Sequence, residues 1–119
     1  EERIGPLRRR AWLVSEFCRG PNLLSHLAAD REPPAAEADA IVSLFAAMHR
    51  QRISHGDLKA TNLLWDAGQV LLIDLDAVVQ HRSPTTHARA WRRDRARLLR
   101  NWPPNCVLQR WLDARLPPV

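Results

Sequence analysis

Apolar and polar positions divide the chain into short elements separated by turn signals. Residues 11–17 are mostly apolar and partly β-branched, which predicts a short strand that the Arg-Gly-Pro sequence at 19–21 ends. Asn22 is a favourable N-cap for a short helix with leucines at positions 23, 24 and 27. The pattern therefore opens with a strand followed by about one or two helical turns.

A longer helix is predicted after the helix-breaking pair Pro33-Pro34. Apolar side chains recur there at i, i+3, i+4 and i+7, the spacing of a single helix face. They are Ile41, Leu44, Phe45 and Met48. The periodicity predicts a helix from roughly Ala36 to Arg50 that buries this face.

Two short apolar runs after this helix predict a β-hairpin. Residues 53–62 have the pattern of a loop, and the runs at 63–65 and 70–73 are joined by the sequence Asp-Ala-Gly-Gln. Two such runs across a Gly-containing connection are typical of a hairpin.

Helical patterns complete the chain. The polar segment 80–86 contains a proline and predicts a loop. Two helix faces follow, one with Trp91, Leu98, Leu99 and Trp102, the other with Val107, Leu108, Trp111 and Leu112. The order of elements predicts a single, mostly helical α+β domain over residues 1–119, with its C-terminal helices at about 87–113.

Composition supports a globular domain and argues against several classes. Of 119 residues, 45% are hydrophobic and 26% charged, an ordinary balance for a soluble protein. No apolar run approaches the roughly 18 residues needed to cross a bilayer, and the first residues lack the pattern of a secretory signal. Cys18 and Cys106 have no ligand-spaced partners, so we expect reduced thiols rather than a zinc site.

The net charge of +5 comes almost wholly from arginine, and Lys59 is the single lysine of the chain. Around it stand Asp57 and Asn62. Phosphoryl transfer needs a group that orients the acceptor hydroxyl, positive charge at the phosphates and ligands for Mg²⁺. A carboxylate, an ammonium group and an amide carbonyl oxygen within six residues offer these three functions.

The predicted hairpin has a geometric consequence. Its second strand returns toward Asn62, so Asp74 should come to lie beside Asn62 and share a metal ion. If the strand continues, Asp76 points to the same side as Asp74 and gives a second carboxylate.

The same residues resemble the catalytic loop of the protein kinase-like superfamily. Residues 55–62 match H-R-D-x-x-x-x-N except that Gly56 replaces the arginine, and residues 74–76 (Asp-Leu-Asp) stand where those proteins carry D-F-G. Residues 13–20 resemble the hinge strand that lines the adenine pocket. Without the arginine we expect no regulation by activation-loop phosphorylation, which suits a small-molecule or glycolipid kinase.

Within that superfamily, residues 54–65 and 72–77 are similar to the bacterial lipopolysaccharide kinases, the Kdo/heptose kinase family. The resemblance implies the C-terminal lobe of a protein kinase-like fold, with a hinge strand at about 11–18, a catalytic loop at 53–62 and a hairpin at 63–73. It also implies a kinase that uses ATP and Mg²⁺ to phosphorylate a sugar hydroxyl of the lipopolysaccharide core or a similar small-molecule or glycolipid acceptor.

Site residues follow from this resemblance position by position. Asp57 would be the catalytic base or acceptor-orienting carboxylate, and Lys59 would contact the γ-phosphate. Asn62 and Asp74 would hold Mg²⁺, while Asp76 would either add a metal or water contact or cap the following loop. The nucleotide would lie against the backbone of Glu16 and Cys18 at the adenine, Asn22 near the ribose, and Leu64 and Ile73 under the base.

Departures from the family pattern keep alternatives open. A complete kinase also has a glycine-rich loop, a strand lysine and a helix glutamate, and the sequence shows none of them. We therefore expect the N-terminal lobe to be absent and this chain alone to lack half of the nucleotide site. The alternatives are a non-catalytic kinase-like binding module and an aminoglycoside- or choline-type phosphotransferase.

Six arginines between Arg89 and Arg100 form either a solvated helix face or a basic surface for anionic membrane phosphate. Asp94 falls instead on the apolar side of that helix. We hypothesise that it accepts hydrogen bonds from the catalytic-loop backbone near His55, which itself should brace the loop. The five tryptophans are expected in the core.

These features predict a cytoplasmic protein. If the arginines are functional, they predict peripheral contact with an anionic inner-membrane surface. Its expected partners are ATP and a sugar or glycolipid acceptor, and no nucleic acid is expected. The sequence leaves the oligomeric state open.

Overall fold

A computed structural model of the protein describes residues 20–119. They form the predicted α+β arrangement, in which helices outweigh short antiparallel strands. The elements are α2 (Leu23–His26), α3 (Ala35–Arg50), β1 (Ile53–Ser54), β2 (Leu63–Asp66), β3 (Gln69–Leu72), β4 (Val79–Gln80), α4 (Pro84–Leu99) and α5 (Val107–Arg115), with 3₁₀ turns at Ala60–Asn62 and Leu75–Ala77. The strand predicted at residues 11–17 lies outside the described residues.

Helix α3 is the centre of the core. It begins directly after Pro34 and ends at Arg50, as its apolar periodicity predicted. Ile41, Phe45 and Met48 are each 1% exposed, because they lie on the face that packs against β1 and β3. The ring of Phe45 also lies 5.7 Å from that of Trp91, which joins α3 to α4.

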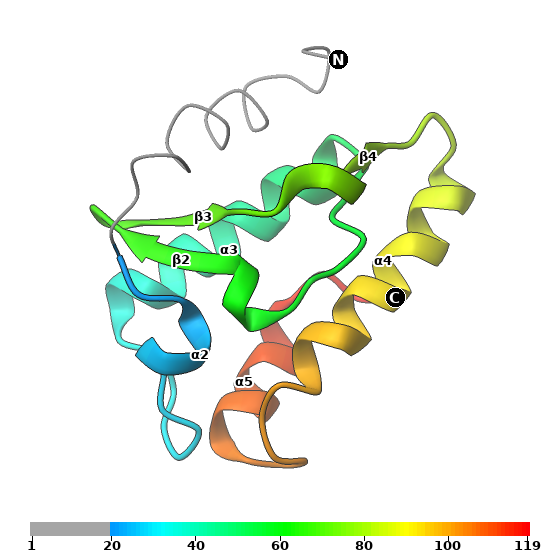
Figure 1. The fold of residues 1–119 in the computed structure, drawn as a ribbon. Helices are drawn as coiled ribbons and strands as arrows, with labels where there is room; N and C mark the ends of the chain where they lie inside the picture. The colour runs from blue at the N-terminus through cyan, green and yellow to red at the C-terminus, as the bar shows by residue number, and fades with distance from the viewer. Residues whose placement is uncertain (1–19) are drawn as a thin grey trace.

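The predicted hairpin is confirmed in β2 and β3, which pair in antiparallel register from Leu63 opposite Leu72 to Asp66 opposite Gln69. Ala67 and Gly68 form its turn with φ angles of 52° and 78°. Positive φ at both central residues defines the turn that suits the twist of two paired strands. Figure 1 shows the hairpin lying across α3.

The second pair of strands was not predicted. Residues 53–62 and 80–86 were expected to be loops, but Ile53 pairs with Gln80 and Ser54 with Val79. Two-residue strands are too short for a periodic signal. They join the two ends of the segment 55–78, which contains the hairpin.

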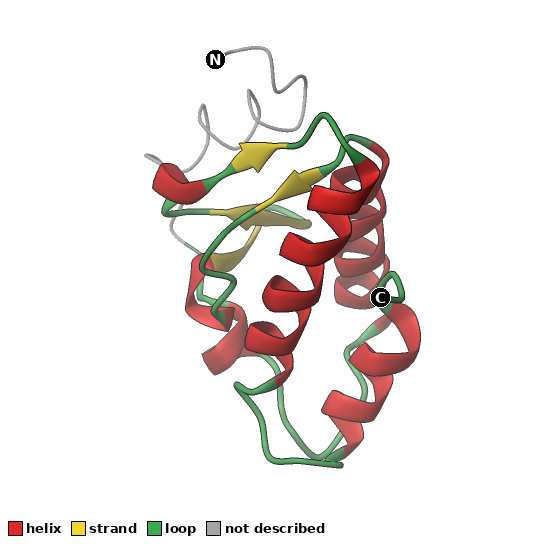
Figure 2. Cartoon of the chain, turned by 90° about the vertical axis from the view of Figure 1, so that its right-hand side faces the viewer, coloured by secondary structure: helices red, strands yellow, loops and turns green. Residues whose placement is uncertain are grey.

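The caps explain where the other helices begin. Asn22 accepts a hydrogen bond from the Ser25 amide and caps α2, as predicted. Helix α4 begins at Pro84, three residues before the predicted start, because Ser83 caps it and a proline is well tolerated at its first position. Figure 2 shows the long helices standing together beside the short strands.

Tryptophans fill much of the remaining core, as expected. Trp91, Trp102 and Trp111 are buried, although Trp102 lies beyond the end of α4 rather than on its predicted face. Trp65 is partly buried against the core, and Cys106 is a free, half-buried thiol. Trp12 and Cys18 lie outside the described residues. Within residues 20–119, no helix combines the length and the apolar character that a membrane span requires.

Replacement of Phe45 by alanine tests the packing of α3. We expect Phe45→Ala to lower the free energy of unfolding by about 3–5 kcal/mol, since it leaves a cavity between α3 and α4. Denaturant unfolding measures the change. Val42→Ala on the exposed side of α3 is the control and should change stability by less than about 0.5 kcal/mol; equal effects of the two substitutions would contradict the assignment.

A buried histidine makes stability depend on pH. Burial lowers the pKa of His87, and the nearby rings of His49 and His81 lower it further. Because the unfolded state takes up the proton first, the stabilisation is complete above pH 6.5 and is lost as the pH falls toward the lowered pKa. The free energy of unfolding should therefore decrease between about pH 7 and about pH 5, with a smaller decrease in His87→Gln. Identical pH slopes for the two proteins would contradict this.

Candidate active site

The segment from His55 to Asn62 connects β1 to β2 and is folded by its own backbone. The Lys59 amide donates to the Asp57 carbonyl at 2.8 Å, and the Asn62 amide donates to the Lys59 carbonyl at 2.9 Å. These bonds form two consecutive tight turns, the second being the 3₁₀ turn that leads into β2. The side chains of Asp57 and Lys59 are consequently held on one short, ordered segment.

His55 braces this loop, as predicted. The ring is fully buried, and its Nε2 lies 2.9 Å from the Ile73 carbonyl oxygen, which can only accept a hydrogen bond. Nε2 therefore carries the hydrogen, and Nδ1 accepts from the Asp57 amide at 3.1 Å. The neutral imidazole links the residue before Asp74 to the backbone of Asp57.

Asp94 anchors the loop to α4, which confirms the hypothesis drawn from its place on the apolar helix face. Its carboxylate is 3% exposed and accepts hydrogen bonds from the amides of His55 at 2.7 Å and Gly56 at 3.1 Å. Hydrogen bonds from amides to a buried carboxylate are charge-assisted and strong. Helix α4 thus fixes the start of the loop that carries Asp57.

Gly56 has a steric role that the sequence alone did not reveal. Its φ of 92° lies in the region that favours glycine, and an added Cβ would lie 2.6 Å from the Cβ of Ala77. The residue therefore allows the loop to pass close to the 3₁₀ turn at Leu75–Ala77. A larger side chain at this position would displace one of the two segments.

The second strand of the hairpin returns the backbone to Asn62, as predicted. The Ile73 amide donates to the Asn62 carbonyl at 3.0 Å, which places the residue after Ile73 beside Asn62. The Asn62 side-chain NH₂ donates to the Asp57 carbonyl at 2.8 Å, so its side-chain oxygen is directed away from that bond. An amide oxygen and a carboxylate are hard oxygen donors, the kind of ligand that Mg²⁺ prefers.

The strand does not continue past Leu72, so the condition under which Asp74 and Asp76 would point to the same side is not met. Asp74 has φ 59° and ψ 68°, a left-handed conformation that turns the chain into the 3₁₀ turn containing Asp76. Strand alternation therefore does not place the two carboxylates on one side. Left-handed residues other than glycine are uncommon, although aspartate tolerates this conformation better than most. Asp76 is exposed in this turn.

Asp57 and Lys59 are the accessible reactive groups of the loop. The Lys59 ammonium lies 3.4 Å from the Asp57 carboxylate, with 40% and 44% of the two side chains exposed. An ion pair of this exposure contributes little to stability. Both groups are therefore available to a ligand, Asp57 as an acceptor for a hydroxyl and Lys59 as a cation for phosphate.

On the nucleotide side, the structure brings together part of the predicted set. Asn22 forms a bridge with Leu64, and the Trp65 amide donates to the Pro21 carbonyl at 2.8 Å. Leu64 is opposite Leu71 on the hairpin, and Ile73 follows β3. The side chain of Asn22 is engaged as a helix cap. Glu16 and Cys18 lie outside the described residues.

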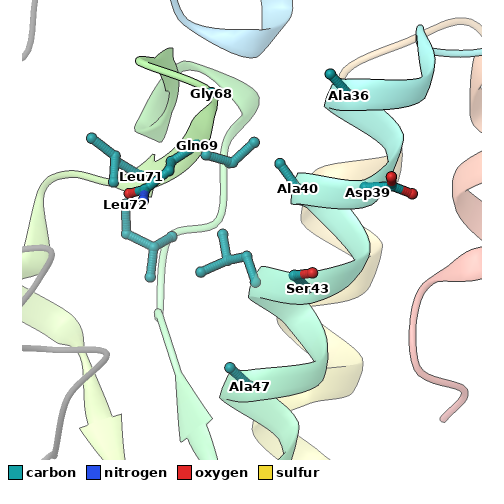
Figure 3. A pocket seen from close by; sticks show the side chains of 11 residues that line it. Ala36, Asp39, Ala40, Ser43, Ala47, Gly68, Gln69, Leu71 and Leu72 are labelled. Carbon is teal, nitrogen blue, oxygen red and sulfur yellow. The ribbon is translucent and has the colours of Figure 1, made fainter.

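Two cavities differ in their relation to the loop. A groove of about 460 Å³ lies between α3 and β3, with no loop residue in its lining; Figure 3 shows the alanines of α3 facing Leu71 and Leu72. A second cavity of about 350 Å³ lies directly against the loop. Its lining includes Asp57 and three arginines: Arg93 and Arg97 of α4, and Arg100 at the C-cap of this helix. The sequence identified the arginines but not which of them line this cavity.

Removal of the Asp94 carboxylate should loosen the loop. Asp94→Ala leaves the buried His55 amide and the part-buried Gly56 amide without their acceptor, so we expect a loss of about 1–3 kcal/mol in the free energy of unfolding, mostly from the His55 amide. Hydrogen exchange of the His55 and Gly56 amides should also accelerate. Asp113→Ala, which removes an exposed ion pair with Arg95, is the control and should cost at most about 1 kcal/mol. Unchanged exchange at both amides in Asp94→Ala would contradict the anchoring role.

Comparison with known proteins gives one family. Residues 1–113 match the model of the lipopolysaccharide kinase (Kdo/WaaP) family. None of the curated proteins matches the chain.

Proposed function

The chain belongs to the lipopolysaccharide kinase (Kdo/WaaP) family, and on this premise we propose that it transfers the γ-phosphoryl group of ATP to a sugar hydroxyl of the lipopolysaccharide core or of a similar glycolipid. One observation carries the proposal: a single ordered loop presents Asp57 and Lys59 and returns through the hairpin to place Asp74 beside Asn62. These groups are the ones that phosphoryl transfer requires.

Asp57 would orient the acceptor. Its carboxylate is partly exposed at the wall of the 350 Å³ cavity, where a sugar hydroxyl can donate a hydrogen bond to it. As the hydroxyl oxygen attacks the γ-phosphorus, the carboxylate accepts the hydroxyl proton and the bond to the β-phosphate oxygen breaks. The hydrogen bond from the Asp57 amide to His55 and the Asp94 anchor keep this carboxylate in place.

Asn62 and Asp74 would hold Mg²⁺ through their oxygens. The ion, when bound, neutralises charge on the phosphate oxygens. Lys59 would then contact the γ-phosphate from the loop. Asp76 remains a candidate for an additional water or metal contact from its exposed position in the following turn.

The nucleotide base would rest on the hairpin. Leu64 on β2 is half-buried, as is Ile73, which follows β3. Together they would give an apolar floor under the base, close to the loop that carries the reactive groups. Glu16 and Cys18 would contact the adenine edge through their backbone, and Asn22 would lie near the ribose.

We also propose that the protein works at the cytoplasmic face of a membrane. This rests on the excess of arginine in α4 and on a lipid-linked acceptor. Two other functions compete with the proposal, namely an aminoglycoside- or choline-type phosphotransferase and a non-catalytic binding module. The choice of acceptors and the variants below distinguish the proposed lipopolysaccharide kinase from both alternatives.

Two substitutions test the chemistry in the full-length protein. With labelled ATP and a panel of Kdo- and heptose-containing acceptors, Asp57→Asn should lower kcat by about 10²–10⁴-fold with little change in ATP affinity. Asp74→Asn should abolish Mg²⁺-dependent ATP binding.

The control is Asp66→Asn at the far end of the hairpin, which should retain full activity. Aminoglycosides and choline belong in the same panel, and transfer only to them would replace the proposed acceptor class. If the parent protein transfers nothing and Asp74→Asn leaves ATP binding unchanged, the enzyme proposal fails.

A further inference from the structure

The cavity beside Asp57 is built from three parts of the chain that are far apart in sequence. The catalytic loop gives Ser54, Gly56, Asp57 and Leu58, and the 3₁₀ turn and β4 give Ala77 and Val79, with His81 directly after β4. Helix α4 and its C-cap give Ala90, Arg93, Asp94, Arg97 and Arg100. Its volume of about 350 Å³ is at the lower end of small-molecule sites. A single sugar unit is an occupant of suitable size.

The arginines stand on one side of α4. Arg93, Arg97 and Arg100 follow each other at i, i+4 and i+7, the spacing of a single helix face. Arg97 is half-buried, while the other two are exposed at the rim. Three guanidinium groups consequently line the same cavity as the carboxylate that would orient the acceptor.

These guanidinium groups have no structural partner among residues 20–119. No carboxylate there lies within ion-pair distance of them, and none of them donates a side-chain hydrogen bond. Arg95 on the same helix is different, because it binds Asp113 and the carbonyl oxygens of Asp113 and Pro117. Asp94, the nearest buried carboxylate, already accepts hydrogen bonds from two loop amides.

We propose that Arg93, Arg97 and Arg100 bind an anionic group of the acceptor, a carboxylate or a phosphate close to the hydroxyl that is phosphorylated. This inference rests on the proposed function. Arginine presents planar pairs of donors that match both anions in bidentate geometry. An anion held there fixes the acceptor relative to Asp57 and offsets the repulsion between the two negative groups.

The geometry favours an acceptor group over a membrane surface as the source of this anion. The three arginines open into a cavity shared with Asp57, whereas a flat lipid surface would be met equally by the other exposed arginines of α4. Arg89 and Arg92 are exposed on the same helix and do not line the cavity. They provide matched controls of identical charge.

The test uses the full-length protein, ATP and one acceptor in two forms: Kdo and its methyl ester, which removes the negative charge. Arg97→Ala and Arg93→Ala should each raise the KM for Kdo by about 10- to 100-fold, the range expected for a lost charge-assisted contact. The KM for ATP should stay constant, and the preference for Kdo over its ester should disappear. Arg92→Ala should match the parent protein.

Binding of Kdo and of inorganic phosphate, measured by calorimetry without ATP, separates this inference from the proposed function. If the parent protein binds Kdo and phosphate without transferring a phosphoryl group, and Arg97→Ala selectively loses this binding, the anion site is supported and only the kinase proposal fails. Phosphoryl transfer that is equally efficient in Arg97→Ala and Arg92→Ala overturns the anion site alone.

Vesicle binding tests the alternative that these arginines bind a lipid surface. Sedimentation with phosphatidylglycerol vesicles, compared with phosphatidylcholine, should show no greater loss for Arg97→Ala than for Arg92→Ala. If instead Arg97→Ala weakens vesicle binding selectively and leaves the KM for Kdo unchanged, the arginines serve a lipid surface and the proposal is wrong.

Discussion

The carboxylate of Asp94, buried against the amides of His55 and Gly56, is the interaction on which the site depends. A loop between two short strands has backbone groups that no sheet or helix satisfies, and a buried unpaired amide costs about 1–3 kcal/mol. A carboxylate from α4 supplies both acceptors at once. It thereby fixes the position of the loop relative to the helix that also carries Arg93 and Arg97 of the cavity beside Asp57.

Two further constraints hold the rest of the loop, which carries the reactive side chains, in place. His55 donates to the Ile73 carbonyl and accepts from the Asp57 amide, so a neutral ring couples the return of the hairpin to the loop. Gly56 permits the close approach to Ala77. In the sequence, Gly56 stands where the protein kinase-like superfamily has an arginine. In the structure, a glycine is needed there because φ is positive and a Cβ would collide with Ala77. The left-handed Asp74 completes the arrangement by turning the chain beside Asn62.

Helical periodicity and local turn residues were sufficient to predict much of the fold from the sequence. The periodicity of α3 and the turn residues of the hairpin predicted both elements, and the apolar position of Asp94 pointed to its inward carboxylate. The β1–β4 pair and the start of α4 were not predicted, since two-residue strands have no period and the polar segment with Ser83 and Pro84 has the composition of a loop. The sequence left open whether the strand continues to Asp76, and a single positive φ at Asp74 ends the alternation before it. Which arginines line the cavity beside Asp57 depends on the rotation of α4, which tertiary packing determines.

The most direct test is a double-mutant cycle between Asp94 and Asp57 in the full-length protein, read as kcat for phosphoryl transfer. If Asp94 acts by holding the loop that presents Asp57, Asp94→Asn should lower kcat strongly in the parent protein and hardly at all in the Asp57→Asn background. Equal, additive losses in the two backgrounds would contradict the account.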